Sequence, residues 1–143
     1  MKPIPTVGVL LFKEDQVLLV RHEAGGSHVP GTYGIPAGRF EPNETSIQAA
    51  RRELEEETGL ATSENDLEEL PISLPPADLK RKDGSIKRFT ITLFYCRAYQ
   101  GSLRPSDETT PLWIPVNEAV TLNLEGHTKK MIEEGFALSK KYE

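Results

Sequence analysis

The sequence is poor in several features that define other classes of protein. Its single cysteine, Cys96, excludes a disulfide within the chain, so we expect a reducing, cytoplasmic location. No apolar run approaches the roughly 18 residues that a membrane-spanning helix needs, so no membrane contact is expected. The apolar N-terminal segment lacks a small-residue cleavage site, and we interpret it as a strand rather than a signal peptide.

Basic charge is also scarce in this chain. Its 17 Lys and Arg residues stand against 22 Asp and Glu residues, which gives a formal net charge of −5. Binding along a nucleic acid depends on a basic face that neutralises phosphates, so stable nucleic-acid binding is not expected. The length suits one domain with a substantial core, and we expect residues 1–143 to form it.

Hydrophobic patterning predicts an α/β fold. Residues 6–12 and 17–20 are nearly continuous apolar runs joined by a short polar segment, as in a hairpin of buried strands. Residues 89–99 are apolar on both faces, which predicts a central strand with Cys96 in the core. Other expected features are short strands at 70–74 and 111–116, an Asp83-Gly84 hairpin turn, a brief helix capped by Asn117 and a helix over 127–141. This order favours a mixed sheet between helices.

Residues 38–60, GRFEPNETSIQAARRELEEETGL, predict a loop followed by a helix. Thr45 is a suitable N-cap, and Gln48 three residues later completes a capping box. Gly59 supplies a left-handed stop at the other end. The apolar residues between the two caps recur at helical spacing, so one face of this helix is expected to pack on the core.

The same helix carries three carboxylates on one face. Glu53, Glu56 and Glu57 stand at positions i, i+3 and i+4, where like charges repel by a few tenths of a kcal/mol per pair. A charged helix face is often just solvated, and the spacing of these three residues alone leaves that alternative open. The other interpretation is a site for a hard divalent cation, because Mg²⁺ binds through carboxylate oxygens.

The full spacing favours the second interpretation. The stretch matches the pattern Gly, five residues, Glu, seven residues, Arg-Glu-apolar-any-Glu-Glu-any-Gly-apolar, and a chance match at one starting point is on the order of 10⁻⁹. The matching residues are Gly38, Glu44, Arg52, Glu53, Leu54, Glu56, Glu57, Gly59 and Leu60. This stretch resembles the conserved box of the Nudix hydrolases.

The resemblance implies a fold, an activity and a metal. The fold is an α/β/α sandwich, and the activity is hydrolysis of a nucleoside diphosphate linked to another moiety, X. By resemblance, Glu53, Glu56 and Glu57 hold Mg²⁺, with Mn²⁺ as a substitute, and the backbone carbonyl of Ala37 or Gly38 is a further ligand. Ala37 stands where the family often has the first of two glycines.

Other roles also follow from the resemblance. Arg52 is expected to orient Glu53 through a charge-assisted hydrogen bond. Glu44 is expected to support the ligands or to interact with the positive end of the helix. The general base is either Glu53 or an acid on a later loop, for which Glu108 is the candidate. The alternative for Glu108 is an ordinary exposed loop acid.

The substrate pocket has weaker signals. Arg21, Tyr33 and Phe40 are candidates for a phosphate clamp and a stacking ring. The basic hairpin at residues 80–88 is either part of that clamp or a charged, solvated edge. His28 lies in a glycine-rich loop, residues 23–31, and we interpret it as solvent-exposed, with a ligand role as the alternative.

Two substrate classes and two other functions are considered. Pro75 and Pro76 follow Leu60 at a spacing that resembles the ADP-ribose-hydrolysing branch, and a nucleoside triphosphate is the other candidate substrate. One alternative function is a catalytically silent Nudix domain that senses nucleotides or binds a protein, although such members usually lose box residues. The other is an isomerase of isoprenoid diphosphates, which would need a cysteine in its site.

Overall fold

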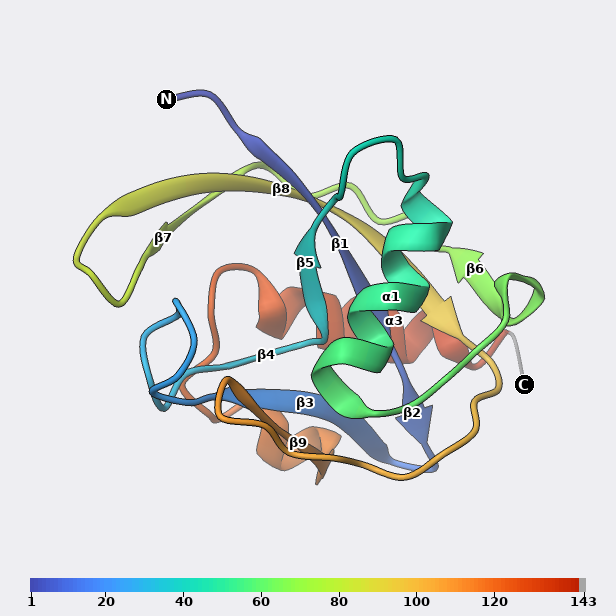
Figure 1. The fold of residues 1–143 in the computed structure, drawn as a ribbon. Helices are drawn as coiled ribbons and strands as arrows, with labels where there is room; N and C mark the ends of the chain where they lie inside the picture. The colour runs from blue at the N-terminus through green and yellow to red at the C-terminus, as the bar shows by residue number, and fades with distance from the viewer. Residues whose placement is uncertain (142–143) are drawn as a thin grey trace.

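The strands form two sheets (Figure 1). The computed structural model describes residues 1–141. The first sheet has the order β5-β1-β8-β6, with β7 also paired to β8. Its strands are β1 (Ile4–Leu10), β5 (Ala37–Arg39), β6 (Leu67–Glu69), β7 (Ala77–Lys80) and β8 (Ile86–Cys96). The second sheet has the order β2-β3-β4, with β9 paired to β3. Its strands are β2 (Phe12–Lys13), β3 (Gln16–His22), β4 (Tyr33–Gly34) and β9 (Thr109–Pro115).

Strand β8 is central in the first sheet, as its two apolar faces predicted. It runs parallel to β1, with Ile4 opposite Phe89, and antiparallel to β6 and β7 along its other edge. The turn that joins β7 to β8 contains the predicted Asp83-Gly84 pair, and Gly84 has a φ of 89°. Cys96 at the end of β8 is buried, in agreement with its expected place in the core.

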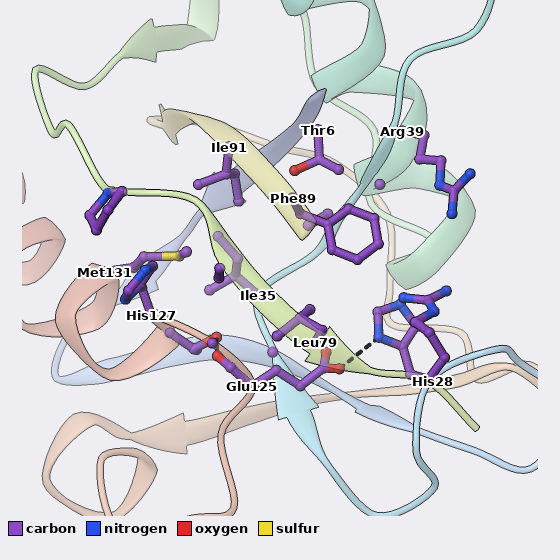
Figure 2. A pocket seen from close by; sticks show the side chains of 18 residues that line it. Thr6, His28, Ile35, Arg39, Leu79, Phe89, Ile91, Glu125, His127 and Met131 are labelled. Carbon is purple, nitrogen blue, oxygen red and sulfur yellow. Dashed lines mark hydrogen bonds and ion pairs between the residues drawn. The ribbon is translucent and has the colours of Figure 1, made fainter. Parts of the chain in front are cut away.

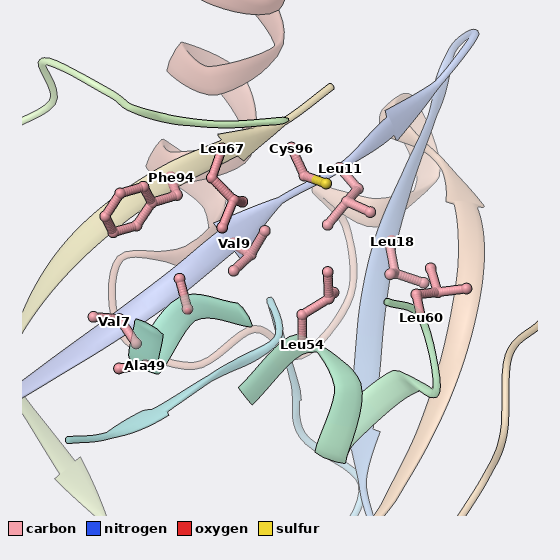
Figure 3. Close-up of a cluster of buried hydrophobic side chains, with 11 residues drawn as sticks. Val7, Val9, Leu11, Leu18, Ala49, Leu54, Leu60, Leu67, Phe94 and Cys96 are labelled. Atoms are coloured by element: carbon pink, nitrogen blue, oxygen red, sulfur yellow. The ribbon is translucent and has the colours of Figure 1, made fainter. Parts of the chain in front are cut away.

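Helices cover both sides of the sheets, which confirms the predicted α/β/α sandwich. The helical segments are α1 (Ser46–Thr58), a 3₁₀ turn (Glu64–Asp66), α2 (Val116–Ala119) and α3 (Thr128–Ser139). Figure 3 shows Leu54 of α1 pointing into one apolar cluster with Val9 of β1. Met131 and Ile132 of α3 belong to a second cluster, with Leu93 of β8. Among the helices that the structure describes, none is long and apolar enough to cross a membrane.

Three local predictions were wrong. Residues 6–12 do not pair with 17–20 as one hairpin, because β1 belongs to the first sheet and only β2 pairs with β3 at this turn. A strand was expected at 70–74, but the strand in this part of the chain, β6, lies earlier and ends at Glu69. Pro71, Pro75 and Pro76 follow it, and a proline has no N–H to donate to a ladder. Asn117 does not cap α2 but lies within it, because the helix begins directly after Pro115, whose ring holds φ near −53°.

The short strand β5 positions the site. It pairs antiparallel with β1, with Ala37 opposite Gly8 and Gly38 opposite Val7. Its other neighbour is α1, so the backbone of β5 is held between the core sheet and the carboxylate-bearing helix. Any group held at Ala37 and Gly38 is therefore next to the side chains of α1.

Candidate functional site

Helix α1 begins and ends as predicted. Thr45 Oγ1 accepts the Gln48 N–H at 3.3 Å, and Gln48 Oε1 accepts the Thr45 N–H at 3.0 Å, so the capping box is complete. Gly59 has a φ of 86°, and an added Cβ there would lie 2.8 Å from the Ser102 carbonyl oxygen. Both the positive φ and the short distance to Ser102 require glycine at position 59. The caps fix the helix ends, and burial of Leu54 fixes its rotation.

Arg52 is the centre of a charged network. Its guanidinium donates to Glu44 Oε2 at 2.7 Å, Glu44 Oε1 at 2.8 Å and the Arg39 carbonyl at 2.9 Å. It also donates to Glu53 Oε1 at 2.8 Å and Glu56 Oε2 at 3.1 Å. The two hydrogen bonds from Arg52 are the main cause that lowers the pKa of Glu44 to about 2. Arg52 thereby connects the loop before α1 to two carboxylates of the helix, those of Glu53 and Glu56.

Glu53 faces the backbone of β5. Its side chain is only 12% exposed, and burial raises its pKa to about 7, although the Arg52 guanidinium partly offsets the rise. An added Cβ on Gly38 would lie 2.2 Å from the Glu53 carboxyl carbon, so the carboxylate occupies the space that a side chain at residue 38 would fill. Glycine at position 38 is therefore a steric requirement for this position of Glu53.

Glu57 also contacts β5. Its Oε1 accepts the Ala37 N–H at 2.7 Å. Burial raises the pKa of Glu57 well above its ordinary value, the Ala37 N–H opposes this, and the negative charges of Glu53 and Glu108 add to it. Glu56 differs from both neighbours, because its side chain is 56% exposed. The face therefore has two inward carboxylates and one outward carboxylate.

These residues fit a hard divalent cation. The donor set is entirely oxygen, and two of its carboxylates are held against the same two residues of β5, Ala37 and Gly38. Burial makes both carboxylates costly to ionise, and a nearby cation would offset that cost. The backbone carbonyls of Ala37 and Gly38 belong to the strand next to them, and the family resemblance implies that one of the two is a further ligand.

Glu108 lies just before β9, and its charge acts on Glu57. Its backbone carbonyl accepts the Glu23 N–H at 2.8 Å, which ties this loop to the glycine-rich loop after β3. The fold therefore brings this later-loop acid near the carboxylate face from a position 51 residues further along the chain than Glu57. It stays a candidate for the general base.

A cavity of about 140 Å³ lies beside the carboxylate face and shares Ala37 and Gly38 with it (Figure 2). Its apolar lining comes mainly from β7, β8, α3 and the segment before β5, and includes Ile35, Leu79, Ile91 and Met131. The Phe89 ring lies in its wall, with the guanidinium carbons of Arg39 and Arg81 at 5.7 and 5.4 Å from the ring centroid. Nε2 of His127, also in the wall, is buried without a hydrogen-bond partner among the described residues.

The three residues predicted for the pocket do not line this cavity. Arg21 pairs with Glu23 at 2.9 Å, Tyr33 packs against the core cluster that includes α3, and Phe40 packs against the α1 cluster. From the basic hairpin, Arg81 does line the cavity.

The interpretation of His28 as solvent-exposed was wrong. Its side chain is 27% exposed and lies 2.8 Å from Glu125. The cause is tertiary, because the glycine-rich loop folds back on the segment between α2 and α3.

Sequence reasoning missed most of the cavity wall. Phe89, Arg39, Glu125 and His127 come from four separate segments, and their sequence neighbours form no motif. Phe89 was predicted as part of a strand, without a role in binding. The only signal was the alternation of β8, which places Phe89 and Ile91 on one face.

The fold and the carboxylate-bearing helix define an α/β/α sandwich domain with an oxygen-rich site on one helix. The chain belongs to the NUDIX domain family, whose model matches residues 2–135. Mouse 8-oxo-dGDP phosphatase NUDT18 is 41% identical over 54 residues, which are 38% of this chain and 16% of that protein. Nudix hydrolase 25 of Arabidopsis thaliana is 42% identical over 60 residues, which are 42% of this chain and 33% of that protein. The matches therefore span a third or less of the length of these curated relatives.

Solved structures agree in fold across nearly the whole chain. The NUDIX domain of Shewanella oneidensis NrtR, in a cocrystal structure with ADP ribose, matches with a TM-score of 0.73 and 18% sequence identity. The match covers 96% of this chain and 88% of the other. This likeness confirms the predicted fold class.

Proposed function

We propose that this protein is a metal-dependent pyrophosphohydrolase that cleaves a nucleoside diphosphate linked to another moiety, X. The observation that carries the proposal is the position of Ala37 and Gly38. They line the cavity and also contact the two inward carboxylates, Glu57 and Glu53. A ligand with an apolar ring in the cavity and phosphates over β5 would therefore place its phosphates at the carboxylate face.

The cavity suits a nucleoside. Its apolar lining suits the ring of a nucleobase, and the Phe89 side chain offers a surface on which that ring can stack. Arg39 and Arg81, which lie near the Phe89 ring, supply positive charge for phosphate oxygens. His127 Nε2 is a buried polar atom that still lacks a hydrogen-bond partner, and a polar edge of the base would satisfy it.

The carboxylate face suits hydrolysis. Glu53, Glu56 and Glu57 would hold Mg²⁺ or Mn²⁺, which supplies charge neutralisation at the phosphates when bound. Arg52 holds Glu53 and Glu56 in position through its hydrogen bonds. Glu53, whose pKa burial raises to about 7 in the metal-free protein, is one candidate to accept a proton from the attacking water. Glu108 is the second candidate for this base, because it faces the same cluster from the opposite loop.

Two substrate classes fit this site. ADP-ribose is supported by the fold relative that was crystallised with that molecule, and Pro75, which carried the sequence cue, lines the cavity. A nucleoside di- or triphosphate, oxidised or not, is supported by the name of the NUDT18 relative. We also propose a cytoplasmic location, because the lone Cys96 is a buried thiol.

The test is a substrate panel with the full chain. ADP-ribose, dinucleoside polyphosphates, NADH, nucleotide sugars and normal or oxidised nucleoside triphosphates are incubated with Mg²⁺ or Mn²⁺, and products are separated by chromatography. AMP plus ribose phosphate identifies ADP-ribose as a substrate, whereas a nucleoside monophosphate plus pyrophosphate identifies a triphosphate. Turnover that stops in EDTA supports the proposal. Binding of a panel member without any turnover would instead support a nucleotide sensor.

A further inference from the structure

A second group of potential metal ligands lies beside the cavity, which His28 and Glu125 line. None of its members belongs to α1, although the charge of Glu125 acts on Glu57 of that helix. His22 is the last residue of β3, His28 lies in the glycine-rich loop, and Glu125 lies between α2 and α3. His22 Nε2 is 2.9 Å from Glu125 Oε1, and His28 Nδ1 is 2.8 Å from Glu125 Oε2. The two imidazole rings stack with centroids 3.8 Å apart and planes 5° apart. Figure 2 shows the Glu125 carboxylate directed at His28.

The geometry of this group is compatible with a metal site. One ligand atom from each residue lies within 4.8 Å of the other two, and no other trio of His, Cys, Asp or Glu side chains in residues 1–141 meets this test. Around tetrahedral Zn²⁺, bonds of about 2.0–2.1 Å place the ligand atoms about 3.3 Å apart. The two measured separations are about half an ångström shorter, so small side-chain rotations would admit an ion.

Burial and the types of ligand suit a bound ion here. The side chains of His22 and Glu125 are only 7% and 13% exposed. Each Glu125 oxygen lies within 2.9 Å of an imidazole nitrogen, so the three side chains meet in a poorly hydrated position. Two imidazoles and an ionised carboxylate are a ligand set that Zn²⁺ prefers.

We propose that His22, His28 and Glu125 bind one Zn²⁺ or a similar transition-metal ion, independently of the carboxylates of α1. Gly34 leaves room beside the ligands, because an added Cβ there would already contact Glu125 Oε1 at 3.5 Å and His22 Nε2 at 3.6 Å. That open side suits a water or other small fourth ligand. The positive charge of Arg81 acts on Glu125 and weakens the site for any cation.

The two sites differ in the ions that they select. The carboxylate face offers only oxygen, which suits Mg²⁺, whereas two of the three ligands in the second group are imidazole nitrogens. An ion at the second group would join β3, the glycine-rich loop and the segment before α3. The last two of these segments line the cavity, through His28 and through Glu125. The bound ion would therefore stabilise the cavity edge rather than take part in hydrolysis.

The test uses Co²⁺ as a coloured substitute for Zn²⁺, with the full chain in a large excess of Mg²⁺. Excess Mg²⁺ occupies sites that have only oxygen ligands, so the visible absorption of Co²⁺ reports nitrogen coordination. We expect one equivalent of Co²⁺ to bind with strong visible bands, and Zn²⁺ to displace it. His28→Gln should weaken this binding by at least about tenfold, because it removes one of three ligands. His28 is the most exposed of the three, so this variant is expected to fold.

His127→Gln is the matched control. His127 lines the same cavity and is not one of the three ligands, so this variant should bind Co²⁺ like the wild type. Zn²⁺ should also raise the melting temperature of the wild type and of His127→Gln, but not that of His28→Gln. Equal binding by His28→Gln and wild type would overturn the proposal, as would the absence of visible bands at any Co²⁺ concentration below the millimolar range. Neither result bears on hydrolysis, which the substrate panel tests separately.

Discussion

Glu56→Gln should separate activity from stability at one residue. The side chain is 56% exposed and has one ion pair, with Arg52 at 3.1 Å. Exposed pairs of this kind contribute about 0.2–1 kcal/mol, and the charge of Glu56 also repels Glu53. The two effects oppose one another, so the free energy of unfolding of the metal-free protein should change by about 0.5 kcal/mol or less. Glutamine has nearly the size and helix propensity of glutamate, so packing adds nothing.

The expected effect on catalysis is much larger. Removing the negative charge of Glu56 weakens the hold on a cation at the phosphates, and kcat should fall by about 10² or more. That factor corresponds to about 2.7 kcal/mol of transition-state stabilisation. Mg²⁺ should also raise the melting temperature of Glu56→Gln less than that of the wild type.

Glu44→Gln is the matched control within the same Arg52 network. Glu44 is only 11% exposed, and it accepts two hydrogen bonds from Arg52 at 2.7 and 2.8 Å. Glutamine keeps one acceptor and directs an NH₂ group at the guanidinium, so we expect a loss of about 1–3 kcal/mol. The melting temperature should fall by several degrees. The stabilising effect of Mg²⁺ should persist, because Glu53, Glu56 and Glu57 remain.

Thermal melts in EDTA and in Mg²⁺, together with rates on the best substrate of the panel, test these expectations. The reasoning would be refuted by a Glu56→Gln variant that melts far below the wild type in EDTA. It would also be refuted by an equal Mg²⁺ shift in the two proteins. The first result would make Glu56 a structural residue, and the second would remove it from the metal site.

Three further predictions follow from the same contacts. Gly38→Ala should lower kcat by at least about tenfold, because the added Cβ would displace the Glu53 carboxylate. The free energy of unfolding should change little, because the atoms that must move belong to a side chain and not to the backbone. A kcat equal to that of the wild type would contradict the close approach of the Glu53 carboxylate to Gly38. Glu44 has a folded pKa of about 2 against an ordinary value of 4.5, so its contribution to stability is complete above pH 4.5 and is lost as the pH falls towards 2. Urea unfolding across this range should show a shallower loss for Glu44→Gln than for the wild type, and parallel curves would contradict the pairing. Phe89→Ala should raise KM by about tenfold with less change in kcat, because a stacking surface is lost. An unchanged KM in steady-state assays would mean that the nucleobase of the substrate does not stack on Phe89.

Local signals in the sequence predicted the carboxylate helix well. Thr45 and Gln48 form the expected capping box, and Gly59 has the expected left-handed conformation. These features depend on residues within one or two turns of the helix, and such contacts can be read from spacing alone. The spacing of Glu53, Glu56 and Glu57 likewise placed them on one face, but it did not predict that two face inward and one faces solvent.

The elements between the motifs were less predictable. Strand β6 ends before residues 70–74, where Pro71 interrupts the ladder, and β8 pairs further along its length with β7. The prediction for His28 failed for a similar reason, since its environment depends on Glu125, which is 97 residues away. No property of the glycine-rich loop itself indicates that contact.

The sequence alone determined the family resemblance and the ends of α1. It also determined that Glu53, Glu56 and Glu57 share one face of that helix, because helical periodicity and capping are local. Only the tertiary structure decided which residues form the cavity. It brings Phe89, Arg39 and Arg81 together from β8, β5 and the hairpin, and it places Arg21, Tyr33 and Phe40 elsewhere. Strand pairing and loop closure join segments that are distant in sequence. The positions of such side chains depend on the packing of the whole chain and not on their neighbours in the sequence.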